Sequence, residues 1–397
     1  MSKLILVWPK GPKISPKTIH IPGYQPGKKV MELAENLTIY SNQMLGAYVP
    51  AYKSIPLRLG FCFKPIWSST PNTYKNPLLE AVGVDRSFWS RKLSVWHTLP
   101  VEATALLTLY SPEDLREIAE FWFSDRVHYV DSCFDNPIQR DHNGALGFGW
   151  LINSLILPAQ TVWWDSMKTR PEAGRFGVKL EGSGKVRVFA IANPVFQALL
   201  RPLHDWVMEC LRTLKTDGTF HQTAPLERHQ GKTNLYSFDL KAATDSLPVD
   251  LSGSMLSGLL GRDFAQSWVY IMTSPGFRTP GGSHVGTSKH VYRFKKGQPL
   301  GYYSSWPVFA LTHHMLVWWA AWSVYPGKRF FDYAILGDDI VIADDKVAAK
   351  YAELIEDCEV SISKEKSLIS KSGAMEFAKR FLTDRGMTDL SPVSVRK

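Results

Sequence analysis

Residues 333–342 constrain the fold of this chain more than any other segment. Two short apolar runs there flank the tripeptide Gly337-Asp338-Asp339. Apolar runs joined by a glycine and a turn-forming acid predict a β-hairpin with a tight turn. Such a hairpin would hold both carboxylates at its tip. Glycine and aspartate are also common in ordinary solvated turns, so the segment alone fits a catalytic and a purely structural role equally well.

A second acidic segment favours the catalytic interpretation. An apolar strand-like run ends at Asp239, and Asp245 follows it. Nucleotidyl transfer needs two hard cations held close together, and carboxylates from two strands can supply their ligands. We therefore predict that Asp239 and Asp338 bind two Mg²⁺ ions, with Mn²⁺ as the alternative ion and Asp339 as an auxiliary ligand. Asp245, taken alone, is equally well explained as a helix N-cap or a surface acid.

Composition describes a globular protein with a basic surface. An apolar content of 45% is enough for a sizeable core and excludes a disordered chain. The formal net charge of +9 favours a polyanionic partner or an anionic membrane surface, without choosing between them. The four cysteines show no Cys-x-x-Cys spacing, so neither a zinc cage nor a disulfide framework is predicted.

The uncharged stretch 298–327 is long enough to span a membrane. Gly301, Pro307 and the pair His313-His314 interrupt its apolar character, so we expect a helix buried in a large core and no stable membrane insertion. Adjacent side chains on a helix point apart, so the two histidines cannot share one metal ion. We expect them to be histidines with satisfied hydrogen bonds, either in the core or behind the residues that form the site.

The rest of the chain divides into regions that differ in composition and in hydrophobic periodicity. Residues 1–75 are Pro-rich and expected to be irregular, and a capping pattern predicts a helix over 111–126. An apolar periodicity over 195–211 predicts another helix. From about residue 233, short β-like runs alternate with helical stretches, which is typical of an α+β domain.

The order of these segments resembles the palm of viral RNA-dependent RNA polymerases, and specifically that of the mitoviruses. Asp239 and Asp245 resemble motif A, and the Gly-Asp-Asp hairpin resembles motif C. The other matching segments are 184–191 (motif F), 217–220 (a further mitoviral signature), 297–314 (motif B), 362–367 (motif D) and 376–380 (motif E). The resemblance covers about residues 175–382, and so long an ordered set is more specific than any single motif.

The resemblance implies an α+β fold: a right-hand polymerase palm with an antiparallel sheet and helices, partial fingers and a thumb that is largely missing. Residues 1–75 would be the N-terminal segment, 76–232 a fingers-like region, 233–382 the palm and 383–397 a C-terminal tail. It also implies RNA template and product and nucleoside triphosphates as partners. A mitochondrial location is implied by the resemblance alone, because the proline-studded N-terminus makes a poor transit helix.

Three cations receive roles in this interpretation. Lys185 and Arg187 alternate on one predicted strand face and would grip the triphosphate, although exposed strand cations without function explain them as well. Lys366, or with less support Lys364, would be the general acid that protonates the leaving pyrophosphate. A solvated lysine in a charged run is the alternative.

Motifs A and B would recognise the nucleotide. By resemblance, Asp245 would accept a hydrogen bond from the ribose 2′-hydroxyl, the group that distinguishes RNA from DNA. Gly301 would permit close backbone approach, and Ser304 or Ser305 would bond the ribose or template. A plain helix-entry loop is the competing account. Many viral polymerases carry a motif B asparagine that partners the second motif A acid, and 306–311 contains none.

Three alternatives remain beside an active polymerase. Only 381–397 follow Arg380, so the sequence predicts a fragment or a host-integrated copy, and a catalytically impaired RNA-binding relic is the main alternative. A reverse transcriptase is disfavoured because 240–244 lacks a bulky aromatic gate and Leu336 stands where an aromatic would be expected. Only the net positive charge and the uncharged stretch 298–327 would support a membrane-associated basic protein.

Overall fold

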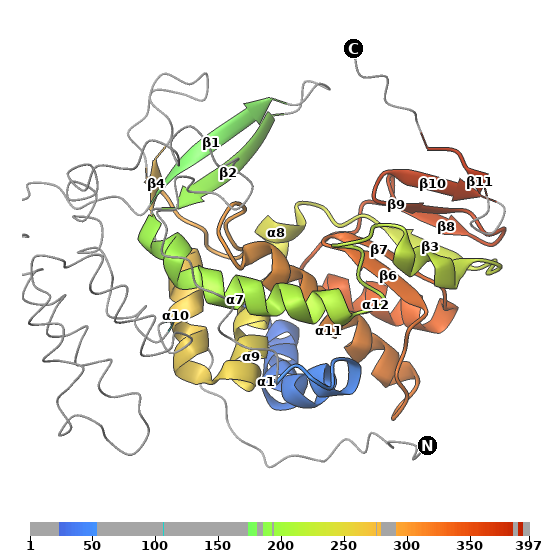
Figure 1. The fold of residues 1–397 in the computed structure, drawn as a ribbon, viewed down its shortest axis with the longest axis horizontal. Helices are drawn as coiled ribbons and strands as arrows, with labels where there is room; N and C mark the ends of the chain where they lie inside the picture. Colours follow the sequence, from blue (N-terminus) through green and yellow to red (C-terminus); the bar gives the residue numbers. More distant parts are fainter. Residues whose placement is uncertain are drawn as a thin grey trace, which may run out of the picture.

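The computed structural model describes residues 24–53, 106, 174–180, 186–192, 194–274, 276–278, 291–383 and 388–391. Lys185 and the helix expected over 111–126 lie outside the described residues. Helices and antiparallel sheets share the described part of the chain (Figure 1), which confirms the predicted α+β class.

A four-stranded sheet of order β6-β7-β3-β8 carries the predicted hairpin. Its strands are β3 (Leu235–Phe238), β6 (Tyr333–Leu336), β7 (Asp339–Ile342) and β8 (Leu368–Ser370), and every neighbouring pair is antiparallel. Their β-branched and aromatic residues suit a sheet that is buried on both faces. The strands expected around the two acidic segments are therefore confirmed.

One face of this sheet packs against two helices, α11 (Ser305–Val324) and α12 (Asp345–Asp357). Alternation along β3 turns Tyr236 and Phe238 toward this face, and the Phe238 ring stacks on Tyr351 of α12 with centroids 5.7 Å apart. Helix α11 is the uncharged segment, and it is buried as predicted. Among the described helices, none combines the length and apolarity needed to cross a membrane.

The other face packs against a smaller sheet of order β11-β10-β9. Its strands are β9 (Met375–Phe377), β10 (Arg380–Thr383) and β11 (Thr388–Asp389). The residues that meet between the two sheets form a separate apolar cluster with Leu226 of the 3-10 helix Ala224–His229: Leu235, Ala334, Val341, Met375, Phe377 and Leu382. This second sheet therefore supports the hairpin from the side opposite the helices.

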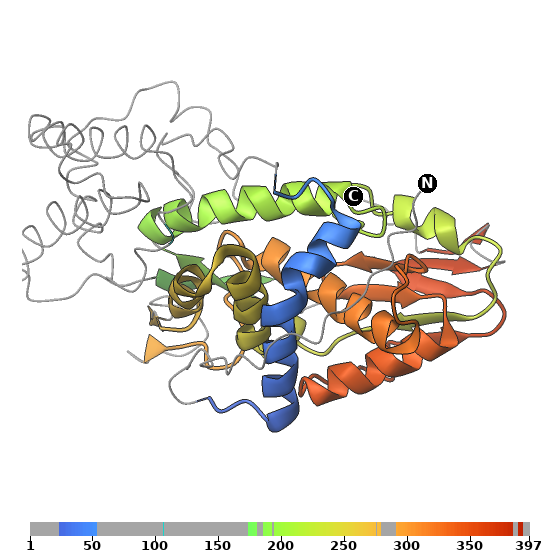
Figure 2. The same ribbon diagram turned by 90° about the horizontal axis from the view of Figure 1, so that it is seen from below.

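Four further helices surround the core (Figure 2): α1 (Lys28–Tyr48), α7 (Pro194–Thr213), α9 (Val249–Leu260) and α10 (Arg262–Thr273). Helix α7 confirms the helix predicted over 195–211. It runs alongside α11, while α1 lies across α9.

Helix α1 corrects one expectation, because 1–75 was predicted to be irregular throughout. Val30, Leu33, Ala34 and Leu37 are all buried, and their spacing is that of one helix face. The helix lies between Pro26 and Pro50, and no proline falls within that interval. Regular structure therefore starts earlier than composition indicated.

A separate β-hairpin lies at the end of the molecule away from β9 and β10 (Figure 1). Strands β1 (Gly174–Leu180) and β2 (Val186–Ala192) pair antiparallel in it. Two short strands, β4 (Phe277–Arg278) and β5 (Val291–Tyr292), extend it to a sheet of order β2-β1-β4-β5.

Two histidines with a lowered pKa predict an acid-sensitive fold. Burial, followed by nearby cationic groups, lowers the pKa of His204 and of His229 to about 4. Because the unfolded chain binds protons with a histidine pKa near 6.5, stability should fall as the pH drops through 6.5 toward 4. Each histidine should remove roughly 2 kcal/mol between pH 7 and 5.

Denaturant unfolding of the wild type and of His229→Gln at both pH values would measure this loss. The loss for His229→Gln should be smaller, since the glutamine does not titrate. Carboxylates with a raised pKa act in the opposite direction, so the difference between the two proteins is the quantity to compare. Equal losses in both proteins would contradict the prediction.

Candidate active site

The turn between β6 and β7 has two residues, Gly337 and Asp338, because Leu336 pairs with Asp339 across it. Gly337 has φ +62°, the positive value that a type II′ turn places at its first central position. A Cβ atom on Gly337 would lie 2.0 Å from the Trp306 ring of α11. Glycine is therefore required both by the turn and by the helix beneath it.

Asp239 lies beside this turn. Phe238 pairs with Ile340 in the antiparallel register of β3 and β7, so the chain leaves β3 next to Asp339. The backbone of Asp239 is fixed by motif D: its N–H donates to Ser367 Oγ at 3.2 Å, and its carbonyl accepts from Ser363 N–H at 2.8 Å. The two acidic segments of the sequence thus meet at one edge of the sheet.

The pKa of Asp339 shows that several carboxylates lie close together at this edge. Burial raises the pKa of Asp339 to about 7. Repulsion from Asp338, Glu376 and Asp239 adds to this rise in the pKa, and Lys379 opposes it. Asp338 itself is exposed, while Asp239 and Asp339 are half-buried.

Glu376 is an acid to which the sequence interpretation gave no role. It lies on β9, its N–H donates to Ser237 Oγ at 3.0 Å, and its Oε1 accepts from Lys379 N–H at 3.0 Å. Burial, and then Asp239, raise the pKa of its carboxyl group. The sequence contained a signal, since Glu376 opens motif E, but only the packing of β9 on β3 brings it to the acids.

Lys366 lies beside the same acids. Its Nζ is 3.6 Å from Asp239 Oδ2, and its side chain is 68% exposed. An exposed ammonium at this distance can reach a phosphate group that occupies the space next to Asp239. Lys364, the less favoured candidate, is exposed in the same loop.

The motif B loop makes two backbone contacts that only glycine permits. A Cβ atom on Gly297 would lie 2.2 Å from the Thr244 carbonyl oxygen and 2.6 Å from Asp245 Cα. Gly301 has φ +107°, and a Cβ atom there would lie 2.3 Å from the Ala190 carbonyl oxygen. The motif B loop therefore lies in close backbone contact with motif A on one side and with strand β2 of motif F on the other.

Asp245 lies on the short helix α8 (Ala243–Ser246), against the backbone of Gly297. Its side chain is exposed, and desolvation raises the pKa of its carboxyl group. The structure therefore joins it to the motif B loop through main-chain contact.

Ser304 and Ser305 are both buried, with hydroxyl groups that have partners within the protein. Ser304 Oγ accepts from Trp268 Nε1 at 2.9 Å, and Ser305 Oγ accepts from Gln298 Nε2 at 3.1 Å. These bonds hold the entry to α11. Neither serine shares the exposed surface on which Asp245 lies.

Arg187 is exposed on β2, directly opposite Lys179 of β1. Sequence reasoning missed Lys179, because the pairing depends on the hairpin register. Like charges placed directly opposite each other repel, and a bound anion would relieve that repulsion. The structure thus adds a cation beside Arg187.

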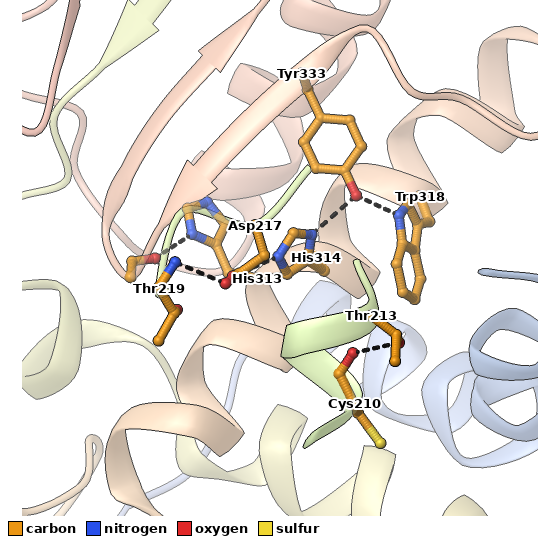
Figure 3. Close-up of polar contacts among 9 residues, drawn as sticks. Cys210, Thr213, Asp217, Thr219, His313, His314, Trp318 and Tyr333 are labelled. Atoms are coloured by element: carbon orange, nitrogen blue, oxygen red, sulfur yellow. Dashed lines mark hydrogen bonds and ion pairs between the residues drawn. The ribbon is translucent and has the colours of Figure 1, made fainter. Parts of the chain in front are cut away.

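The two histidines of α11 point apart, as predicted (Figure 3). His313 Nδ1 lies 2.7 Å from the Gly337 carbonyl oxygen, under the Gly-Asp-Asp turn. His314 Nε2 lies 3.0 Å from Asp217 Oδ2, and its Nδ1 lies 2.9 Å from the Tyr333 hydroxyl. Both histidines are buried, so their structural interpretation is confirmed.

The carboxylates fit a hard divalent cation. Among the described residues, no three histidine, cysteine, aspartate or glutamate side chains form a ready-made metal cage. Mg²⁺ usually keeps several waters and takes only one or two protein carboxylates together with substrate phosphates. Asp239 and Asp338 could provide those carboxylates, and a cation would relieve the repulsion that helps to raise the pKa of Asp339 to about 7.

Comparison with known proteins decides the family. Residues 145–397, well over half of the chain, match the family model for the mitovirus RNA-dependent RNA polymerase. The chain belongs to this family. The RNA-directed RNA polymerase of Cryphonectria parasitica mitovirus 1 is 37% identical over 244 residues, which are 60% of this chain and 29% of that protein.

Mitochondrial plant proteins are similar as well. An uncharacterized mitochondrial protein of Arabidopsis thaliana is 43% identical over 196 residues, which are 48% of this chain and 76% of that protein. Among solved structures, the RNA-dependent RNA polymerase of a human picobirnavirus superimposes with a TM-score of 0.41 at 14% identity, covering 55% of this chain and 45% of that chain. The chain thus spans less than half of the viral polymerases it matches.

Proposed function

We propose that this polymerase-family chain adds ribonucleotides to an RNA 3′ end under the direction of an RNA template. The observation that carries the proposal is the register of β3 and β7, which puts Asp239 next to the Asp338-Asp339 turn. Asp239 and Asp338 would hold two Mg²⁺ ions, with Mn²⁺ as a substitute and Asp339 as the auxiliary ligand. Bound ions would activate the 3′-hydroxyl and neutralise the triphosphate.

The residues around these acids would handle the leaving group. The primer 3′-hydroxyl gives up its proton to solvent, its oxygen forms a bond to the α-phosphorus while the bond to the bridging oxygen breaks, and pyrophosphate leaves. Lys366, which lies 3.6 Å from Asp239, would donate a proton to that pyrophosphate. Arg187 and Lys179, together with Lys185, would bind phosphate groups of the nucleotide or of RNA.

Nucleotide selection is assigned to motifs A and B. Asp245 is exposed and would accept a hydrogen bond from the ribose 2′-hydroxyl. Gly301 gives the loop its close approach to β2. Contacts from Ser304 or Ser305 to the ribose or template stay a prediction. Each hydroxyl accepts from its present partner, Trp268 or Gln298, and keeps its O–H to donate, but both serines are buried and would have to become accessible.

Primer extension by the purified chain tests the proposal. A labelled RNA primer on an RNA template should gain the complementary ribonucleotide with Mg²⁺ or Mn²⁺, and EDTA should stop the reaction. Preference for deoxynucleotides would indicate a reverse transcriptase instead. RNA binding without incorporation under either ion would support the RNA-binding relic. The names of the plant and viral relatives support a mitochondrial location, which imaging of the tagged full chain would test.

RNA binding should depend steeply on salt. The chain carries a net charge of +9, and neutralised phosphates release counterions, so affinity should fall linearly on logarithmic axes as salt rises. Replacing Lys179 and Arg187 together by alanine should weaken binding similarly for every sequence and reduce the slope by about 1–2. Filter binding at several salt concentrations measures both effects.

Lys28→Ala is the matched control, because this lysine is exposed on α1 and pairs with Glu32. It should leave the slope near the wild-type value. An affinity that stays flat as salt rises severalfold would contradict electrostatic RNA binding.

A further inference from the structure

His313 joins three elements beneath the catalytic turn. It is a residue of α11, its Nδ1 lies 2.7 Å from the Gly337 carbonyl oxygen, and its Nε2 lies 2.6 Å from the hydroxyl of Tyr351 on α12. The imidazole is only 1% exposed. A buried polar ring with both nitrogens bonded holds its neighbours in fixed positions.

The partners of the ring define its proton positions. A carbonyl oxygen can only accept, so Nδ1 of His313 carries the proton and donates it to Gly337. In the neutral ring Nε2 must then accept, and the Tyr351 hydroxyl donates to it. The hydrogen bonds therefore run in one direction: Tyr351 donates to His313, and His313 donates to the Gly337 carbonyl of the turn.

The carbonyl that His313 holds belongs to the peptide between Gly337 and Asp338. Rotation of this peptide plane would change ψ of Gly337 and φ of Asp338, and so change the type of the turn that carries the Asp338 carboxylate. The hydrogen bond from His313 opposes that rotation. Asp338 is exposed at the tip of this two-residue turn, whereas the Gly337 carbonyl faces the buried imidazole.

Trp306 supports the same turn from the same helix face. It precedes His313 by two helical turns, so the two side chains project on the same side of α11. Its ring occupies the space that a Cβ atom of Gly337 would need. Trp306 limits where the turn lies, and His313 limits how its peptide is oriented.

We propose that His313, oriented by Tyr351, is a positioning residue that sets the direction of the Asp338 carboxylate for binding the divalent cation. The inference rests on the proposed function of Asp338 as a metal ligand. Partners that orient a metal ligand typically change metal affinity or activity 10–100-fold when they are replaced.

Variants of the full chain test the hydrogen bond apart from the packing. His313→Leu removes the donor, whereas His313→Asn keeps an N–H close to the Nδ1 position. Tyr351→Phe removes the hydroxyl that orients the ring. His229→Leu is the control, because His229 is equally buried but bonds the Pro225 carbonyl, away from the turn.

The readouts are Mn²⁺ binding by electron paramagnetic resonance, kcat and KM for single-nucleotide addition, RNA affinity and thermal stability. We expect His313→Leu to weaken Mn²⁺ binding and lower kcat by about 10–100-fold, with RNA affinity within about twofold of wild type. His313→Asn should recover most of the Mn²⁺ affinity and most of kcat. Tyr351→Phe should give values between those of His313→Leu and His313→Asn, and His229→Leu should change neither quantity.

Two results would overturn the inference. One is a folded His313→Leu with wild-type Mn²⁺ affinity and kcat, and the other is a folded His313→Asn no better than His313→Leu. If His313→Leu does not fold, Tyr351→Phe and His313→Asn still decide. If the wild type adds no nucleotide, the proposed function fails, while Mn²⁺ affinity and the ¹⁵N signal of an Nδ1-protonated ring still test His313.

Discussion

Asparagine in place of Asp338 or Asp239 is expected to lower the rate of nucleotide addition by on the order of 10³-fold or more. The amide has nearly the same size as the carboxylate but lacks the negative charge that binds a hard cation. Metal ions contribute several kcal/mol to transition-state stabilisation, and each 1.36 kcal/mol is a tenfold change in rate. Rapid-quench measurement of a single addition, at saturating nucleotide and Mg²⁺, gives the rate directly.

Asp332→Asn is the matched control, because Asp332 precedes the same hairpin at its other end and pairs with Lys232 at 2.6 Å. It should keep the wild-type rate. RNA affinity should stay within about twofold in all three variants, since phosphate contacts dominate binding. An Asp338→Asn variant with wild-type turnover would remove this acid from the reaction.

The sequence predicted the acidic hairpin and its partner strand because both are local features. Apolar runs, a turn glycine and an acid at a strand end lie within a few residues of one another, and these signals needed no tertiary information. Helix α11 was also predictable, since Gln298 and Gly327 bound a long stretch without charge. The resemblance added the order in which these segments occur.

The missed features depend on contacts between distant segments. Lys179 faces Arg187 only in the observed register, and Glu376 reaches the acids only because β9 packs on β3. The partners of Ser304 and Ser305 belong to other elements, so their burial was not visible in the local sequence. Helix α1 was overlooked because proline content outweighed its helical periodicity.

The largest stability effect is expected from a buried pair behind the same sheet. Asp217 and His314 have fully buried side chains, and Asp217 Oδ2 lies 3.0 Å from His314 Nε2. Asp217 also accepts from Thr219 N–H at 2.8 Å (Figure 3). A parallel bridge joins Asp217 to Ile335 of β6. The pair therefore fixes a segment outside the sheet against the hairpin that carries Asp338.

His314→Leu should destabilise the fold by about 3–5 kcal/mol, because it leaves the Asp217 carboxylate buried without its partner. Asp217→Leu should also destabilise, since it leaves His314 Nε2 and the Thr219 N–H without the carboxylate that pairs with them. Replacing both residues by leucine should cost less than the two single losses added together, because no unpaired charge then remains buried. Urea unfolding of the four proteins gives the coupling free energy. Strictly additive losses would show that the two side chains contribute independently of each other, and would contradict the coupling predicted for the pair.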